Sequence, residues 1–171
     1  MNRTKRSLAA LLLLAVGACA QPAPSAEPQA LPADPAADSA SVSVVLDAFH
    51  AAAAAGDFDA YFGLFHPEGV FLGTDATERW TVAQFKEYAR PHFGPGGGWT
   101  YHPRNRSIDF TPDGNAAFFD ELLDNDGLGE TRGSGVLVRD VTGWKVAQYN
   151  LSIPIPNPLA DSVAGMIRAA K

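Results

Sequence analysis

The feature that most constrains the fold is a change of pattern near residue 99, where helical spacing gives way to strand-forming residues. Four later segments are rich in β-branched and aromatic residues, and short stretches of turn-forming residues separate them. These segments are Trp99–Phe110, Ala116–Leu123, Thr131–Arg139 and Trp144–Ile153. Consecutive strands joined by short turns pair as an antiparallel meander. Pro154 and Pro156 then end the sheet.

The first half of the domain has the spacing of amphipathic helices. Ser41–Ala55 places apolar residues every three or four positions, which predicts one buried stripe. Shorter helices are expected over Phe58–Phe65 and Thr81–Arg90, with a short strand at Val70–Leu72 between them. Helices followed by a run of strands predict an α+β fold, with the helices packed on one face of the sheet.

Alternation along the last strand assigns its side chains to two faces of the sheet. The concave face is expected to carry Trp144, Val146, Gln148 and Asn150. The outer face is expected to be apolar through Val136, Val138, Tyr149 and Leu151. Because helices cover only one face, this outer face predicts a homodimer through these four residues. The alternative is that the C-terminal segment folds back over them.

The N-terminus resembles the signal of a bacterial lipoprotein. Basic residues precede the apolar run Leu8–Val16, which is too short to span a bilayer, and Val16-Gly17-Ala18-Cys19 resembles a lipobox. The resemblance implies a signal peptide over 1–19, a lipid on Cys19 and membrane attachment. Ala20 stands where an inner-membrane retention signal has Asp, which favours the outer membrane, facing the periplasm. An ordinary cleaved signal ending near Ala20 is the alternative.

Residues 20–40 are almost all Pro, Ala, Ser and acidic, which predicts a disordered tether. The folded domain is expected over 41–158, followed by a tail over 159–171 that contains a short helix. The chain has 13 basic and 19 acidic residues, and loss of the three basic signal residues leaves a formal charge near −9. Arg104 and Arg106, beside Asp109, are expected on a solvated strand face. No nucleic-acid partner is expected, because the basic surface it requires is absent.

Several segments of the domain resemble the SnoaL-like branch of the nuclear transport factor 2-like superfamily. They are Leu72–Trp80, Phe119–Leu123, Gly133–Leu137 and Gly143–Leu151. The resemblance implies a cone-shaped, curved antiparallel sheet with three N-terminal helices on its concave face. It also implies a pocket at the open end of the cone. Members of the superfamily include cyclases, isomerases, dehydratases, binding proteins and assembly domains, so the fold alone does not define the activity.

The pocket is expected between the concave sheet face and the segment that precedes the third helix. Its predicted residues are Asp75, Glu78, Trp80, Tyr101, His102, Glu121, Gln148 and Asn150. The catalytic candidates are Asp75, Glu121 and His102, because a carboxyl group in an apolar cleft can act as a general acid or base. Only one of Asp120 and Glu121 can face inward. Purely structural roles for Glu78, Gln148 and Asn150 stay open.

No histidine is spaced so that it pairs predictably with Asp75 or Glu121. The sequence therefore favours an envelope-anchored domain that binds a small, largely apolar ligand without catalysis. The alternatives are an isomerase, dehydratase or cyclase that uses a buried carboxyl group, and a dimeric assembly domain. No metal or cofactor is expected, since no cysteine cluster or paired-histidine motif is present.

Overall fold

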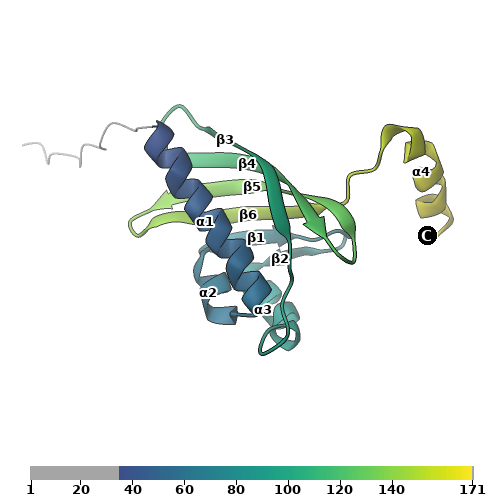
Figure 1. The fold of residues 1–171 in the computed structure, drawn as a ribbon, viewed down its shortest axis with the longest axis horizontal. Helices are drawn as coiled ribbons and strands as arrows, with labels where there is room; N and C mark the ends of the chain where they lie inside the picture. Colours follow the sequence, from purple (N-terminus) through teal and green to yellow (C-terminus); the bar gives the residue numbers. More distant parts are fainter. Residues whose placement is uncertain (1–34, 171) are drawn as a thin grey trace, which may run out of the picture. The chain divides into compact units, whose positions relative to one another are not determined.

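The computed structural model describes residues 35–170, so the predicted signal peptide, Cys19 and residues 20–34 of the tether lie outside the described residues. Six strands form one curved, unclosed sheet in the order β2-β1-β6-β5-β4-β3 (Figure 1). They are β1 (Phe65–Leu72), β2 (Arg79–Thr81), β3 (His102–Phe110), β4 (Ala116–Asn125), β5 (Gly129–Asp140) and β6 (Gly143–Ser152). The antiparallel meander β3-β4-β5-β6 and the α+β fold class are confirmed.

The first two strands differ from the expectation. β1 is longer than Val70–Leu72 and pairs in parallel with β6, while β2 pairs antiparallel with β1. The β1–β6 pairing is interrupted between Phe65 and Val70. Pro67 lies in this interruption, and a proline cannot donate a hydrogen bond to a strand ladder. The strand pattern is therefore weak before Val70, and the sequence predicted only the second half of β1.

The first helix, α1 (Pro35–Ala55), begins within the segment predicted as a tether rather than at Ser41. Proline is well suited to the first turn of a helix, where its missing N–H is not needed. Asp38 lies in the same turn and is paired with Arg139, with 2.6 Å between Oδ1 and Nη2. An ion pair with a distant strand therefore extends the helix beyond its apolar stripe.

The shorter helices follow their predicted caps. α2 (Phe58–Gly63) begins behind Asp57, whose side chain accepts a hydrogen bond from the Ala60 backbone N–H. α3 (Val82–Ala89) begins behind Thr81, which forms a reciprocal capping box with Gln84. A 3₁₀ turn, η1 (Arg90–His92), follows α3. These starts were predictable because capping is a local interaction.

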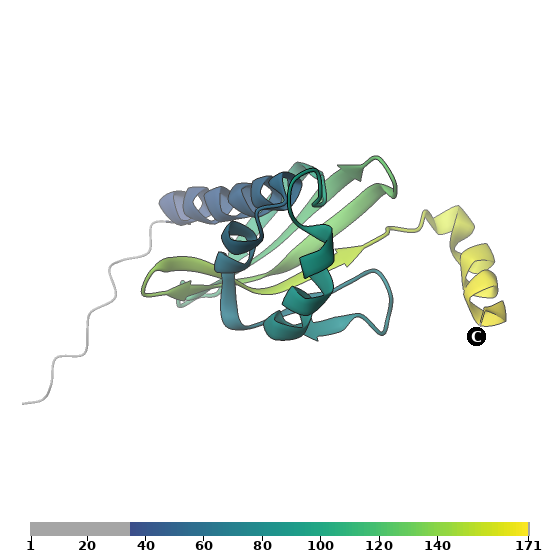
Figure 2. The same ribbon diagram turned by 90° about the horizontal axis from the view of Figure 1, so that it is seen from below.

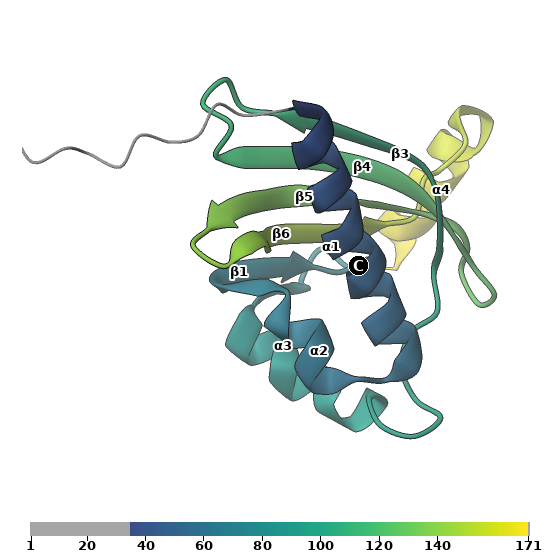
Figure 3. The ribbon, with the colours of Figure 1, turned by 60° about the vertical axis from the view of Figure 1, so that its left-hand side comes forward.

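Helices α1, α2 and α3 lie on the inner, concave face of the sheet. Figures 2 and 3 show α1 running across the strands, with α2 and α3 beside the β1 end. The core between these layers is largely aromatic, and Phe49, Tyr61 and Phe85 are each at most 3% exposed. Trp144 and Val146 are buried in this core, as predicted. The rest of the β6 prediction is wrong.

A β-bulge in β6 inverts the predicted faces of its second half. Leu137 pairs with Val146, but Val136 pairs with Gln148, so Ala147 is an extra residue. Since side chains alternate with period two, one extra residue exchanges the faces of everything that follows. Tyr149 therefore lies on the inner face and is 3% exposed. Gln148 and Asn150 take the outer face.

The residues predicted for a homodimer change for the same reason. Val136 and Val138 lie on the outer face, where they are partly buried. Tyr149 and Leu151 line the interior instead, so their assignment to an outer interface is wrong. Exposed Phe118, the partner of Val136 in the ladder, joins the outer face. The homodimer itself stays a prediction.

A second bulge, in β3, turns Arg106 inward. The pairing of β3 with β4 shifts between Arg104 and Ser107, and Asn105 adopts a positive φ of 52°. Arg104 stays on the outer face and pairs with Asp124 and Glu130. Arg106 instead reaches the inner face, where its side chain is only 14% exposed. The predicted solvated face is therefore correct for Arg104 and wrong for Arg106.

The C-terminal segment forms a 3₁₀ turn, η2 (Asn157–Leu159), and a helix, α4 (Ala160–Ala169). The predicted short helix is confirmed. Its apolar residues Met166 and Ile167 are 71% and 51% exposed, so the helix does not cover the outer sheet face with them. Across residues 35–170, none of the helices has the length and apolar character needed to cross a membrane.

Candidate functional site

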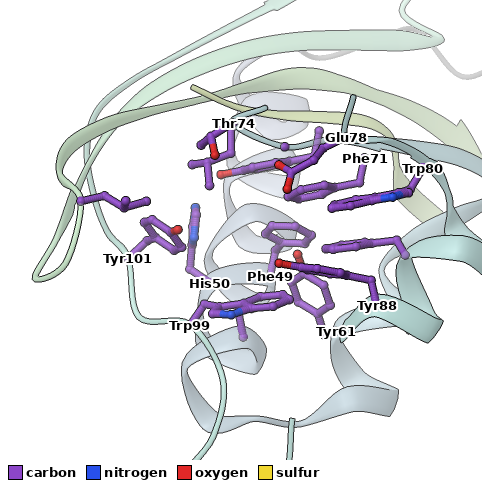
Figure 4. A pocket seen from close by; sticks show the side chains of 16 residues that line it. Phe49, His50, Tyr61, Phe71, Thr74, Glu78, Trp80, Tyr88, Trp99 and Tyr101 are labelled. Atoms are coloured by element: carbon purple, nitrogen blue, oxygen red, sulfur yellow. The ribbon is translucent and has the colours of Figure 1, made fainter. Parts of the chain in front are cut away.

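The inner sheet face and the three covering helices enclose a cavity of about 190 Å³ (Figure 4). Its wall is mostly aromatic. The helices contribute Phe49, Tyr61, Phe85 and Tyr88. The strands and loops contribute Phe71, Trp80, Trp99, Tyr101 and Tyr149. Several rings are nearly parallel: the planes of Trp80 and Phe85 differ by 4°, and those of Phe85 and Trp99 by 11°. Part of the wall is therefore flat and apolar.

Few polar groups other than phenols interrupt this wall. His50 projects from α1, and Thr74 and Glu78 come from the turn between β1 and β2. Figure 4 shows His50 and Tyr101 on one side of the cavity and Trp80 on the other. A bound molecule would therefore meet hydrogen-bonding groups on both sides of a largely aromatic cavity.

Three phenol groups stay neutral around the cavity. Burial raises the pKa of Tyr61, and the neighbouring Tyr149 and Tyr101 raise it further. Burial also raises the pKa of Tyr149, and the charge of Glu121 adds to this effect. The pKa of Tyr101 is raised, mainly by burial. Neutral hydroxyl groups can donate and accept hydrogen bonds without adding charge.

A buried histidine–carboxylate pair lies at the polar end. His50 Nε2 is 2.5 Å from Glu121 Oε1, and the two side chains are 7% and 0% exposed. Opposite an ionised carboxylate, Nε2 is the donor of this hydrogen bond, and Nδ1 is the ring nitrogen that remains. Within residues 38–170, nothing hydrogen-bonds Nδ1. The His50 ring therefore lines the cavity while its Nε2 is held by Glu121 in the layer behind the wall.

Arg106 compensates the buried charge of Glu121. Its Nε donates to Glu121 Oε2 at 2.7 Å, and its Nη1 donates to Asp47 Oδ1 at 2.8 Å and to the Ser43 carbonyl at 3.2 Å. Burial acts to lower the pKa of Arg106, but hydrogen bonds and charges from Glu121 and Asp47 outweigh it and raise the pKa. A buried carboxylate requires such partners, because an unpaired charge in the core is costly.

The structure brings three predicted pocket residues, Glu78, Trp80 and Tyr101, to the cavity wall. Glu121 faces inward, which settles the choice between it and Asp120, but it lies one layer behind the wall and is only 1% exposed. Its predicted catalytic role would therefore act through His50.

The remaining predicted pocket residues lie elsewhere. Asp75 and His102 are exposed and do not line the cavity, and Asp75 accepts hydrogen bonds from the backbone and hydroxyl group of Thr77 in its own turn. Gln148 and Asn150 are on the outer face because of the bulge at Ala147. The catalytic roles predicted for Asp75 and His102 are untested, and neither residue lines this cavity.

Sequence reasoning missed the pairing of His50 with Glu121. One signal was present, because His50 follows Leu46 by four positions and precedes Ala53 by three, on the apolar stripe of α1. A polar side chain on a buried stripe needs a partner. That partner is 71 residues away, so no local pattern could identify it. Among residues 35–170, no group of three or more His, Cys, Asp or Glu side chains could hold a metal ion.

Comparison with known families supports the architecture. The model of the SnoaL-like domain matches residues 42–156. The chain belongs to the SnoaL-like domain family. The matched range of this SnoaL-like domain includes every residue of the cavity wall and the buried pair. No curated protein matches the chain.

Solved structures show the same fold at low sequence identity. A protein from Novosphingobium aromaticivorans, provisionally described as an aromatic ring hydroxylase, is 20% identical with a TM-score of 0.61, over 71% of this chain and 92% of the other. A protein from Streptomyces avermitilis, provisionally described as a dehydratase of the nuclear transport factor 2-like family, is 17% identical with a TM-score of 0.60. The match covers 71% of this chain and 99% of the other. A ketosteroid isomerase-like protein from Erwinia carotovora atroseptica is 19% identical with a TM-score of 0.52, over 68% and 96%. These likenesses establish the fold of the SnoaL-like domain.

Proposed function

We propose that the SnoaL-like domain binds a small, largely apolar molecule with a planar ring in the aromatic cavity. The observation that carries this proposal is the cavity itself, with near-parallel rings and a few hydrogen-bonding groups on its wall. Apolar surface removed from water contributes about 25 cal/mol per Å² to binding. Contacts of a planar ring with the aromatic side chains of the wall add to this contribution.

A titration with naphthalene-2-methanol tests this proposal, because Trp80 and Trp99 line the cavity and report binding through their fluorescence. Leu151→Phe adds volume at the cavity wall and is expected to weaken binding about tenfold, since overpacking costs about 1–3 kcal/mol. Ile153→Phe is the matched control, because Ile153 is exposed two residues further along the chain. Equal affinities for the two variants would place the ligand outside the cavity.

The buried pair of His50 and Glu121 favours a second candidate, proton transfer of the isomerase or dehydratase type. His50 Nδ1 would take a proton from carbon next to a carbonyl group, and Glu121 would stabilise the resulting imidazolium. The proton would then pass to another atom of the molecule, or to a departing hydroxyl group as water. Structural neighbours described as a dehydratase and as isomerase-like are consistent with this candidate.

An activity screen with β-hydroxy ketones and unconjugated enones tests the second candidate. His50→Gln is expected to lower any turnover by at least about a hundredfold, the usual contribution of a general base. His102→Gln is the matched control, because His102 is exposed and outside the cavity wall. Turnover that survives in His50→Gln would exclude His50 as the base.

The proposal includes attachment to the cell envelope, through a lipid on Cys19 at the outer membrane facing the periplasm. Support comes from the lipobox-like residues before Cys19 and from its being the only cysteine of the chain. Cys19→Ala is expected to move the protein from the membrane fraction to the soluble periplasmic fraction. Unchanged fractionation would contradict the lipid anchor and leave the ligand-binding proposal intact.

A further inference from the structure

The charged groups around the cavity are unevenly distributed. Among the described residues that line it, Glu78 is the one carboxylate, and none is a lysine or an arginine. Figure 4 shows the Glu78 carboxyl group on the cavity side of its turn. The side chain is only partly exposed. Among the described residues, a molecule in the cavity therefore meets one carboxylate and neither a lysine nor an arginine on the wall.

The turn between β1 and β2 is built to hold this carboxylate. The Asp75 backbone N–H donates to Glu78 Oε2 at 3.1 Å, and the Gly73 N–H donates to the Glu78 carbonyl at 2.9 Å. A Cβ atom at Gly73 would lie 2.1 Å from Glu78 Oε2, so the absence of a side chain there leaves room for the carboxyl group. These neutral contacts position Glu78 without cancelling its charge.

The layer behind the wall does not reverse this balance. The positive charge of Arg106 is matched by two carboxylates, Glu121 and Asp47, both within hydrogen-bonding distance. The phenol groups of Tyr61 and Tyr149 are neutral because burial raises their pKa. The surroundings of the cavity are therefore negative in total.

The aromatic wall acts in the same direction. The faces of aromatic rings carry negative quadrupole charge and attract cations, most strongly for tryptophan. Trp80 and Tyr88 stack with their ring centroids 4.5 Å apart, and both line the cavity. Trp99 contributes a third electron-rich ring to the wall. The cavity that holds the Glu78 carboxylate is therefore also lined by electron-rich rings.

We infer that the cavity selects planar aromatic compounds that carry an amine or quaternary ammonium group, and that it rejects those that carry a carboxylate. The selectivity rests on the proposed ligand-binding function. It follows from Glu78, from the electron-rich rings of Trp80, Tyr88 and Trp99, and from the lack of a lysine or arginine on the wall in the described part of the chain. Neutral aromatic compounds are expected to have intermediate affinity.

Three probes with one naphthalene ring test this inference in the full chain. They are (2-naphthylmethyl)trimethylammonium, naphthalene-2-methanol and 2-naphthoate, titrated by calorimetry. The ammonium probe is expected to bind at least about tenfold more tightly than 2-naphthoate, within the range of a desolvated cation–π contact. The preference is expected to persist at ~0.5 M salt, where attraction from the exposed surface is screened.

Glu78→Gln is the decisive variant, because the amide oxygen can still accept from the Asp75 N–H while the charge is lost. It is expected to reduce the preference for the ammonium probe over 2-naphthoate to about threefold or less. Asp75→Asn is the matched control, since Asp75 is exposed and outside the cavity wall. It is expected to keep the full preference, and circular dichroism checks the fold of both variants.

The outcomes separate this inference from the function on which it rests. Binding of 2-naphthoate as tightly as the ammonium probe would overturn the charge selectivity, while the bound naphthalene would still support a ligand-binding cavity. A preference that survives Glu78→Gln but is lost in Asp75→Asn would overturn the role of Glu78. Failure of all three probes to bind would overturn both proposals.

Discussion

Strands β4 and β6 flank β5 in one sheet, but their side chains follow the period-two pattern to different extents. β4 pairs with β5 in unbroken register from Ala116 to Asn125, so Glu121 faces inward and Asp120 outward. In β6 the extra residue Ala147 exchanges the two faces. Uninterrupted alternation predicts that Gln148 faces inward, but Tyr149 does so instead. The comparison teaches that alternation locates a buried residue reliably only between bulges.

The bulges in β3 and β6 both contribute to the candidate site. The bulge in β6 brings Tyr149 and Leu151 to the cavity, and the bulge in β3 brings Arg106 to Glu121. Bulges often occur where a strand must re-aim a side chain. The site therefore depends on two strands that break the simple pattern and one, β4, that keeps it.

The largest effect is expected for Glu121→Ala in the regular strand. The substitution leaves His50 and Arg106 without their shared buried partner, which should lower the free energy of unfolding by about 3–5 kcal/mol. Asp120→Ala, one residue away on the outer face, should change it by no more than about 0.5 kcal/mol. Urea unfolding of the two variants measures the contrast, and similar losses would show that the faces of β4 are not distinct.

A somewhat smaller effect is expected for Gly135→Ala beside the β6 bulge. A Cβ atom at Gly135 would lie 2.0 Å from the Gln148 carbonyl oxygen, and backbone cannot easily move away. Overpacking of this kind should cost about 1–3 kcal/mol in urea unfolding. At Gly133 the Cβ atom would meet the Tyr149 hydroxyl at 2.4 Å, which is the end of a side chain. Gly133→Ala should therefore cost less, while weakening naphthalene binding; the reverse order would contradict this account.

A substitution at Asn105, in the bulge of β3, is expected to change the free energy of unfolding by about 1–2 kcal/mol. Asn105 has a φ of 52°, a conformation that asparagine tolerates and β-branched residues do not. Asn105→Val should lower the free energy of unfolding by about this amount, while Asn105→Gly should leave it nearly unchanged or raise it. If both variants behaved alike, the positive φ would not be what holds Arg106 inward.

The smallest effect on folding is expected on the outer face. If two chains meet there, Val136→Asp should give monomers in sedimentation with an unchanged circular dichroism spectrum, because Val136 faces away from the core. Leu151→Asp is the contrasting variant, since it places a charge on the cavity side of β6 and should destabilise the domain itself. A native protein that sediments as a monomer at micromolar concentration would leave the predicted homodimer without support.

The sequence by itself determined the order of the helices and of the four meander strands, the caps of α2 and α3, the turns of the meander and the α+β class. These features depend on neighbouring residues, as in the Thr81 capping box, so a local pattern is sufficient to find them. The sequence showed that only one of Asp120 and Glu121 can face inward, but it did not show which one, because alternation does not say which face is buried. The structure shows that it is Glu121.

Only the tertiary structure decided which residues meet at the site. The pairing of His50 with Glu121 joins residues 71 positions apart, and Arg106 and Tyr149 face the interior only because of bulges. A bulge leaves a weak signal in composition, yet it inverts every following side chain, since the period of a strand is two residues. Local chemistry therefore determined the framework of this domain, and pairing across the sheet determined its candidate site.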